Sequence, residues 1–182
     1  MIKILFICHG NICRSAMAEY VMRDMVKKAG VEDEFEIASA ATSSEELGNP
    51  MYPPARKKLS EHGISGDGHV ARRMRSDDYD KYDMLIGMDS ENLYYMRRMW
   101  ASDEEERAAV YETGNTDESF PPVSKISLMM QYADYERTRE LKPIDEVREV
   151  SDPWYTRDFE ATWQDVSAGC AGLLSMLQSR EP

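Results

Sequence analysis

A cysteine and an arginine six residues apart, Cys8 and Arg14, form the pattern in this sequence that is best suited to chemistry. They enclose a short segment between an apolar run and a helical pattern, where a loop can aim successive backbone N–H groups at an anion. Gly10 and Asn11 tolerate the left-handed backbone conformations that a curled loop requires. The planar guanidinium of Arg14 can bind two phosphate oxygens at once. The segment therefore predicts a phosphate-binding loop of Cys8, His9, Gly10, Asn11, Ile12, Cys13, Arg14 and Ser15.

Cys8 is the candidate nucleophile of this loop. A helix N-terminus and an arginine both favour a thiolate over a thiol, and the thiolate is the reactive form. Attack of Cys8 on phosphorus would give a phosphocysteine, with the loop N–H groups and Arg14 stabilising charge on the equatorial oxygens. Ser15 can donate a hydrogen bond to the thiolate and make it a better leaving group in the second step. In the alternative interpretation, Cys8 is a core thiol at a strand end and Arg14 is a surface charge.

Other chemistries at such a turn are disfavoured by the residues present. A Cys/Arg pair at this spacing occurs easily by chance, so its placement between a strand and a helix carries the argument. The segment does not end in Gly-Lys-Ser/Thr, which excludes a nucleotide-binding loop of the Walker A type. The histidines His9, His62 and His69 lack the spacing of metal ligands, so neither a metal nor another cofactor is predicted.

The leaving oxygen of a phosphate ester needs a proton donor, and a carboxylic acid is the expected group. Asp152, in the segment Asp152-Pro153-Trp154-Tyr155, is the best candidate. Pro153 fixes the turn that follows it, and the two aromatic residues can form a wall for a flat substrate ring. The alternative is that Asp152 is an ordinary loop carboxylate before the last helix.

Strands and helices that would position these residues alternate along the chain. Residues 3–7 have the composition of a buried strand, and apolar residues then recur at helical spacing until Gly30. Further strands are predicted at 35–39, 83–87 and 126–130, and further helices at 54–62, at 90–100 with Ser90 as the N-cap, and at 159–177. This alternation is typical of an α/β fold with a parallel sheet, whose ligands bind at the carboxyl ends of the strands.

Composition and charge limit the class of protein. With 182 residues and a mean hydropathy of -0.60, the chain fits one domain, residues 1–182, with well-solvated faces. A formal net charge of -12 opposes binding to nucleic acid or to an anionic membrane. The apolar run at residues 4–8 is too short for a signal peptide. Three cysteines without disulfide spacing indicate a reducing compartment, so the expected location is the cytoplasm.

The stretch at residues 101–122 does not fit a minimal core. It holds seven acidic residues against one arginine, together with Gly114, Asn115 and two adjacent prolines. We expect a polar insertion or a mobile loop within the single domain. The alternative is a solvated surface segment without a function.

These motifs resemble those of the low-molecular-weight protein tyrosine phosphatase family, whose loop follows Cys-x-Gly-Asn-x-Cys-Arg-Ser and whose acid lies in Asp-Pro-aromatic near the C-terminus. Shorter matches follow in order at residues 17–19, 39–42, 48–50, 69–72 and 88–89. The resemblance implies an α/β fold of three layers, with a doubly wound four-stranded parallel sheet and helices on both faces. It also implies hydrolysis of phosphotyrosine in protein substrates, with Cys8 as nucleophile, Arg14 as phosphate clamp and Asp152 as general acid and then base.

The resemblance assigns supporting roles as well. The implied network around the loop comprises Asn11, Ser15, Ser39 and His69, and the implied walls of the substrate pocket are Trp154 and Tyr155. Two positions depart from the family pattern. Ala16 replaces a proline, and Glu45 stands where the family often has an aromatic residue in the loop that overhangs the pocket.

Rival functions have different sequence requirements. Thioredoxin-coupled arsenate reductases use a similar loop but need two further cysteines after the third strand, and beyond the loop this chain has only Cys170. Arginine phosphatases resemble the same family but carry Thr where this chain has Ile12. A catalytically dead module that binds phosphotyrosine would lack Cys8, Arg14 or Asp152, and all three are present.

Cys13 has two interpretations. It is either a small buried side chain that fills the loop, or a redox partner that traps oxidised Cys8 as a disulfide before irreversible oxidation. A loop wrapped around one phosphate makes the second interpretation feasible, and family members with the same cysteine pair behave as it implies.

Overall fold

The computed structural model describes residues 1–112 and 124–179, with side chains placed for residues 1–102 and 124–179. In this part of the chain one parallel sheet has the strand order β2-β1-β3-β4. The strands are β1 (Ile2–Cys8), β2 (Phe35–Ala41), β3 (Met84–Gly87) and β4 (Ile126–Leu128). Ile4 of β1 is in register with Ile37 of β2 and with Met84 of β3, so β1 lies in the interior of the sheet.

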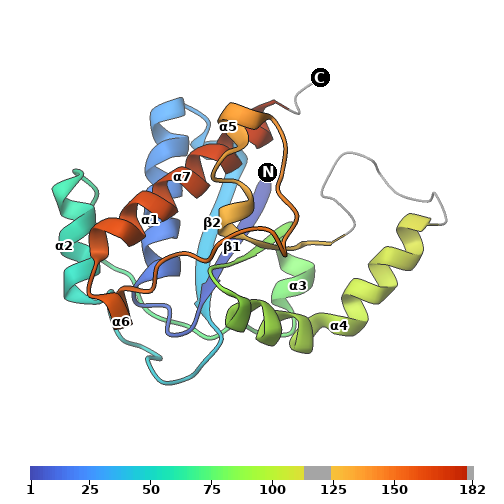
Figure 1. Ribbon diagram of the computed structural model, residues 1–182. Helices are drawn as coiled ribbons and strands as arrows, with labels where there is room; N and C mark the ends of the chain where they lie inside the picture. Colours follow the sequence, from blue (N-terminus) through green and yellow to red (C-terminus); the bar gives the residue numbers. More distant parts are fainter. Residues whose placement is uncertain (113–123, 180–182) are drawn as a thin grey trace.

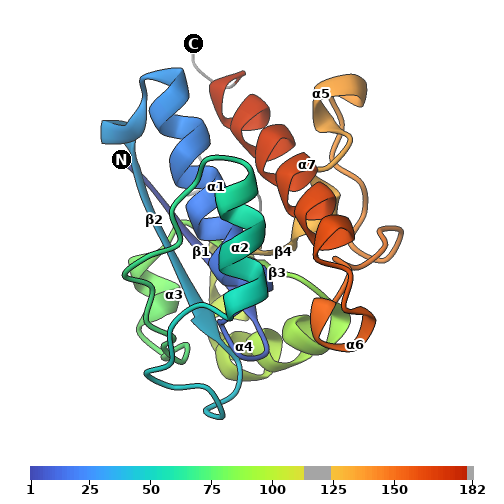
Figure 2. The same ribbon diagram turned by 90° about the vertical axis from the view of Figure 1, so that its left-hand side faces the viewer.

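Helices cover both faces of the sheet (Figure 1). One face carries α1 (Arg14–Ala29), α2 (Pro53–Glu61) and α7 (Phe159–Gln178), and the other carries α3 (Asp78–Lys81) and α4 (Ser90–Glu112). Figure 2 shows α1, α2 and α7 side by side over one face. Ile4 and Phe6 of β1 belong to the core on that side, whereas Leu5 and Ile7 belong to the core beneath α3 and α4. The predicted three-layer, doubly wound α/β fold is confirmed.

The local sequence explains the main elements. β1 has no alternation of apolar and polar residues because it is covered on both faces, and Ile4 to Ile7 are fully buried. α1 ends at Gly30, whose φ of 73° lets its N–H close the last turn on the carbonyls of Val26 and Lys27. α7 packs an apolar stripe against α1 and α2. Neither α7 nor any other helix in the described residues is long and apolar enough to cross a membrane.

Two predicted boundaries are wrong for identifiable reasons. The N-cap of α4 is Asp89, because its Oδ1 accepts the Asn92 N–H at 2.7 Å. Ser90 instead donates its N–H and hydroxyl to Glu149. The fourth strand stops at Leu128, before residue 130, because a turn of 3-10 helix, η2 (Met129–Gln131), follows directly. The structure also contains η1 (Glu32–Glu34), α5 (Tyr135–Thr138) and α6 (Pro153–Thr156).

The stretch predicted as an insertion or loop at residues 101–122 is in part helical. α4 continues to Glu112 with a break at Trp100, where φ is -120° and ψ is 24°. Trp100 is fully buried and donates its Nε1–H to the Ser76 carbonyl at 3.1 Å, which fixes the end of the first half. The second half projects from the body of the molecule (Figure 1). The loop prediction is therefore wrong for residues 101–112, where Ala, Glu and Arg favour a helix, and residues 113–122 lie outside the described part.

Candidate active site

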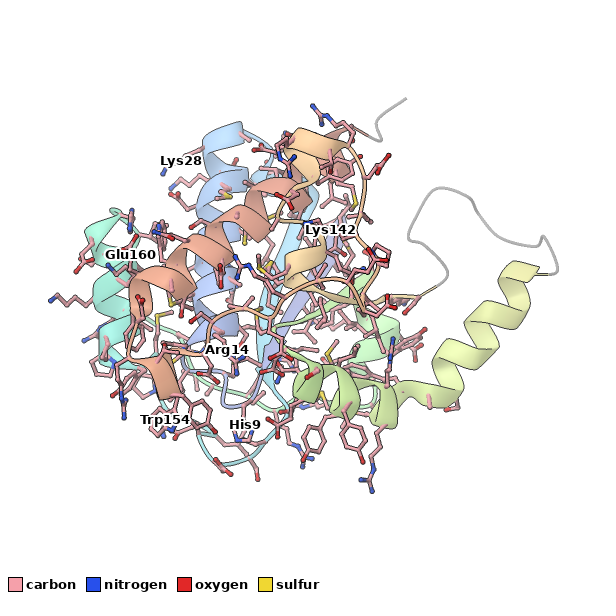
Figure 3. All side chains as sticks on the ribbon, viewed as in Figure 1. His9, Arg14, Lys28, Lys142, Trp154 and Glu160 are labelled. Carbon is pink, nitrogen blue, oxygen red and sulfur yellow. The ribbon has the colours of Figure 1, made fainter. Side chains whose placement is uncertain are left out.

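The predicted site residues meet at the carboxyl ends of the strands. β1 ends at Cys8 and α1 begins at Arg14, while Asp89 lies two residues after the end of β3 and Asp152 precedes α6. Figure 3 shows His9, Arg14 and Trp154 at this end of the molecule, far from Lys28 near the end of α1. A pocket of about 210 Å³ opens here, lined by Cys8, His9, Gly10, Ile12, Cys13, Arg14, Glu45, Glu46, Glu91, Asp152, Trp154 and Tyr155. Within the described residues, no group of three or more His, Cys, Asp or Glu side chains could hold a metal ion.

The loop between β1 and α1 takes its shape from Asn11. This residue has a φ of 57°, a left-handed conformation that Asn tolerates better than most residues. The expectation that Gly10 is also left-handed is wrong, since its φ is not positive. A Cβ at Gly10 would lie 3.2 Å from Cγ of Glu46, so a larger residue there would require the Glu46 side chain to shift. The loop leads into α1 without a side-chain cap, so the first N–H groups of the helix remain available to an anion.

The Cys8 sulfur lies at the base of this pocket among hydrogen-bond donors. Its Sγ is 3.0 Å from the Ser15 hydroxyl and accepts the Asn11 N–H at 3.3 Å. Both contacts are buried. Donors aimed at sulfur stabilise a thiolate, and the same thiolate is the leaving group when a phosphocysteine breaks down. The arrangement can therefore serve both attack and release.

Arg14 is buried and divides its guanidinium between two carboxylates. Nη1 lies 2.5 Å from Oδ2 of Asp89, and Nη2 lies 2.7 Å from Oδ2 of Asp152. Burial alone would lower the pKa of Arg14, but the negative charges of Cys8, Asp89 and Asp152 raise it above its ordinary value. Arg14 thus stays charged inside the pocket. Asp89 was not assigned a role from the sequence, although an aspartate that follows a strand at the binding edge was a usable signal.

The side chain and carbonyl of Asn11 are held by the predicted supporting residues. Its Nδ2 donates to Ser15 at 2.9 Å and to Ser39 at 2.8 Å, and its Oδ1 accepts the Arg72 N–H at 3.1 Å. The Asn11 carbonyl lies 2.6 Å from Nε2 of His69. The structure therefore brings Asn11, Ser15, Ser39 and His69 together in one buried network. This network fixes the left-handed residue on which the loop depends.

Glu19 extends this network and was missed by the sequence analysis. The Ser39 hydroxyl donates to its Oε2 at 2.5 Å, and Arg23 pairs with its Oε1 at 2.7 Å. Nδ1 of His69 lies 4.0 Å from the same carboxylate. The available signal was its position on α1, four residues after Ser15, which places both side chains on one side of the helix.

Asp152 and the two aromatic residues form one side of the pocket. Asp152 is the N-cap of α6, with its Oδ1 accepting the Trp154 N–H at 2.9 Å, so the carboxylate is oriented by the turn that Pro153 starts. Trp154 is 48% exposed and its ring packs on Tyr52, with ring centroids 5.8 Å apart. Tyr155 is 82% exposed and lines the mouth of the pocket.

All three cysteines are free, and Cys13 lies in the same loop as Cys8. Burial raises the pKa of Cys13 above its ordinary range, and the negative charge of Cys8 raises it further. Burial raises the pKa of Cys170 in the same direction. Cys13 and Cys170 are therefore protonated near neutral pH, whereas Cys8 is surrounded by donors.

Comparison with known proteins connects this geometry to a family. The family model described as low molecular weight phosphotyrosine protein phosphatase matches residues 3–120, which include the whole loop and Asp89. The chain belongs to this family. The family and the enzyme class predicted from the motifs, a hydrolase of the protein-tyrosine-phosphatase type, are thereby confirmed.

Individual relatives are similar along the whole chain. The low molecular weight protein-tyrosine-phosphatase YfkJ of Bacillus subtilis is 33% identical over 181 residues, which cover 100% of this chain and 99% of that protein. Its crystal structure superposes with a TM-score of 0.77 over 100% of this chain and 98% of that one. Low molecular weight phosphotyrosine protein phosphatase 1 of Drosophila melanogaster is 33% identical over 94% of both chains. A Drosophila arginine phosphatase has a TM-score of 0.72 and 26% identity over 96% of both chains.

Proposed function

We propose that the chain removes phosphate from tyrosine residues of proteins through a phosphocysteine on Cys8. The observation that supports this proposal most strongly is that Cys8, Arg14 and Asp152 line one pocket, with Asp152 and Arg14 in direct contact. Nucleophile, oxyanion clamp and proton donor are the three groups that hydrolysis of an aryl phosphate requires.

In the proposed reaction, the phosphate of the substrate binds to the loop N–H groups and to Arg14. The Cys8 thiolate attacks phosphorus, the bond from phosphorus to the tyrosine oxygen breaks, and Asp152 gives its proton to that oxygen. Asp152 then takes a proton from a water molecule that attacks the phosphocysteine. The phosphorus–sulfur bond breaks, inorganic phosphate leaves, and Ser15 stabilises the departing thiolate. No cofactor takes part in this scheme.

Phosphotyrosine is proposed as the substrate in preference to phosphoarginine, which is the alternative because one of the similar structures is a Drosophila arginine phosphatase. Ile12 places an apolar side chain in the pocket lining, and Trp154 and Tyr155 add aromatic surface next to it. An apolar slot favours an aryl ring, whereas a guanidinium needs polar partners. Peptides that carry phosphotyrosine, phosphoserine or phosphoarginine test this choice, and equal kcat/KM on all three would contradict it.

We also propose that the enzyme acts in the cytoplasm on protein substrates, and neither on nucleic acid nor at a membrane. Three free cysteines support a reducing compartment, and the net charge of -12 disfavours anionic partners.

The nucleophile is tested by Cys8→Ser. This variant is expected to bind orthovanadate or phosphate, because the loop and Arg14 are retained, but to lose turnover of a small aryl phosphate. Circular dichroism and anion binding establish that the variant is folded. Residual activity within about tenfold of the parent would show that Cys8 is not the nucleophile.

A further inference from the structure

Carboxylates from two separate segments surround the mouth of the pocket. Glu45 and Glu46 lie in the loop that follows β2, and Glu91 lies in the first turn of α4. We call these three residues the acidic rim. With Asp152 they make four carboxylates among the described residues that line the pocket, against one guanidinium, that of Arg14. Arg14 is already paired with Asp89 and Asp152, so the rim adds negative charge that Arg14 does not neutralise.

The positive groups near the mouth do not cancel this charge. Nε2 of His9 lies 3.2 Å from Oε2 of Glu45, where the imidazole is half exposed. Arg157 lies over the Trp154 ring, 5.3 Å from its centroid, and forms no ion pair with a rim carboxylate in the described part of the chain. Glu46 accepts a hydrogen bond from the neutral side chain of Asn49. Among the described residues, Glu91 has no ion-pair partner at all.

Exposed aromatic rings continue from the rim along α4. Tyr94 and Tyr95 follow Glu91 by three and four residues, so they lie on the same side of the helix one turn further on. These two residues are 57% and 40% exposed, and their rings pack edge to face. Arg98 already reaches the Tyr94 hydroxyl at 3.4 Å. Carboxylates beside exposed aromatic rings form a surface that binds the ammonium and guanidinium groups of a peptide.

We propose that the acidic rim selects phosphotyrosines whose neighbouring residues are lysine or arginine. This inference rests on the proposed function. A phosphotyrosine carries a charge of about -1.5 to -2 and must pass three carboxylates to reach Arg14. Basic residues on either side of it offset this repulsion and pair with the rim, whereas acidic neighbours add to the repulsion. Charge complementarity thus favours a basic peptide as the occupant of this surface.

The test compares two phosphotyrosine peptides of equal length, one with lysine and one with glutamate on both sides of the phosphotyrosine. At low ionic strength, kcat/KM is expected to be about tenfold higher for the lysine peptide, and the ratio should approach one as salt is added. A small aryl phosphate, 4-nitrophenyl phosphate, is measured in parallel. If it is hydrolysed and the peptide ratio is one or lower at low salt, the rim inference is wrong. If phosphate is released neither from 4-nitrophenyl phosphate nor from the peptides, the proposed phosphatase function itself is wrong.

Two charge-reversal variants test whether the preference for the lysine peptide arises from the acidic rim. Glu91→Lys places a positive charge on the rim and is expected to lower the ratio of the two kcat/KM values by about threefold or more. Glu32→Lys makes the same change in total charge on an exposed residue of η1, which precedes β2 and so lies at the amino ends of the strands, away from the site at their carboxyl ends. The ratio should stay at the parent value in Glu32→Lys. An equal fall in both variants would assign the preference to net charge and overturn the role of the rim.

Discussion

Oδ2 of Asp152 lies 2.7 Å from Nη2 of Arg14. The carboxyl group proposed as proton donor is therefore paired with the guanidinium that is proposed to bind the phosphate. The other end of the guanidinium is held from inside the protein by Asp89. Asp152 is the more exposed of the two carboxylates, with 26% of its side chain accessible against 13% for Asp89. In the proposed reaction, an arriving phosphate therefore displaces Asp152 from Arg14 and leaves Asp89 in place.

Replacing Asp152 by asparagine tests the proton donor. Asp152→Asn is expected to slow hydrolysis of aryl phosphates with poor leaving groups by about 10²- to 10⁴-fold, since the leaving oxygen then departs without a proton. Phenols of low pKa need less help, so their esters should lose less rate. Turnover is measured across a series of phenols. An equal rate loss for phenols of high and low pKa would assign the proton to another group.

Asp89 caps α4 and pairs with Arg14, and two substitutions can distinguish these two contacts. Asp89→Asn keeps an oxygen that can cap α4 but removes the charge that holds Arg14, whereas Asp89→Ala removes both. We expect both variants to raise the KM for aryl phosphates, because Arg14 loses its inner partner. Only Asp89→Ala should also lose about 1 kcal/mol of unfolding free energy. Denaturant unfolding and steady-state kinetics measure the two effects, and an unchanged KM in Asp89→Asn would remove Asp89 from the positioning of Arg14.

The left-handed conformation of Asn11 predicts an order of stability between two substitutions. Asn11→Gly and Asn11→Ala both lose the hydrogen bonds to Ser15 and Ser39, but only alanine also strains the backbone at a φ of 57°. The free energy of unfolding of the alanine variant should be about 1–2 kcal/mol lower than that of the glycine variant. Chemical denaturation of both proteins provides the measurement. Equal stabilities would mean that the loop relaxes to a different backbone conformation.

Cys13 remains a proposed redox partner. Hydrogen peroxide should convert the Cys8 thiolate to a sulfenic acid, which the Cys13 thiol can condense with to give a disulfide and water. Inactivation is then expected to reverse with a dithiol in the parent, to be slowed by bound phosphate, and to become largely irreversible in Cys13→Ala. Activity after reduction is the readout. If the alanine variant recovers as fully as the parent, Cys13 only fills the loop.

The burial of Cys13 and Cys170 predicts which of the three thiols is alkylated. Because burial raises the pKa of Cys13 and of Cys170, both should stay protonated as pH rises through about 8.5, the ordinary value for a thiol. Iodoacetamide at neutral pH should therefore modify Cys8 alone and abolish turnover, as mass spectrometry of the peptides can show. Modification of Cys13 at a comparable rate would contradict this picture of the loop.

The site could be predicted from the sequence where its residues are contiguous. The segment from Cys8 to Ser15 carries the proposed nucleophile, the left-handed residue and the guanidinium in one loop, so its placement between a strand and a helix locates it. Asp89 reaches Arg14 only because β3 lies next to β1, and that pairing depends on long-range packing. Glu19 contributes through Ser39, a contact between α1 and β2 that no local pattern encodes.

Some elements of the fold could be predicted from local sequence patterns, and others could not. Buried strands and the apolar stripe of α7 are visible as composition and period, whereas α3, α5 and α6 have four residues each and show no full helical period. The second half of α4 was predicted as a polar insertion or loop because its charge density hid a run of good helix formers. The cap of α4 was placed one residue late because Asp89 and Ser90 are both good N-cap residues.

The position of Trp154 gives the protein an optical reporter of occupancy. Of the three tryptophans, only Trp154 lines the pocket, whereas Trp100 is fully buried and Trp163 is stacked on His62 at 3.7 Å. An anion or aryl group that enters the pocket changes the surroundings of one indole while the other two keep theirs. Intrinsic fluorescence can thus follow ligand binding in Cys8→Ser, where no product is formed, and Trp154→Phe identifies the signal.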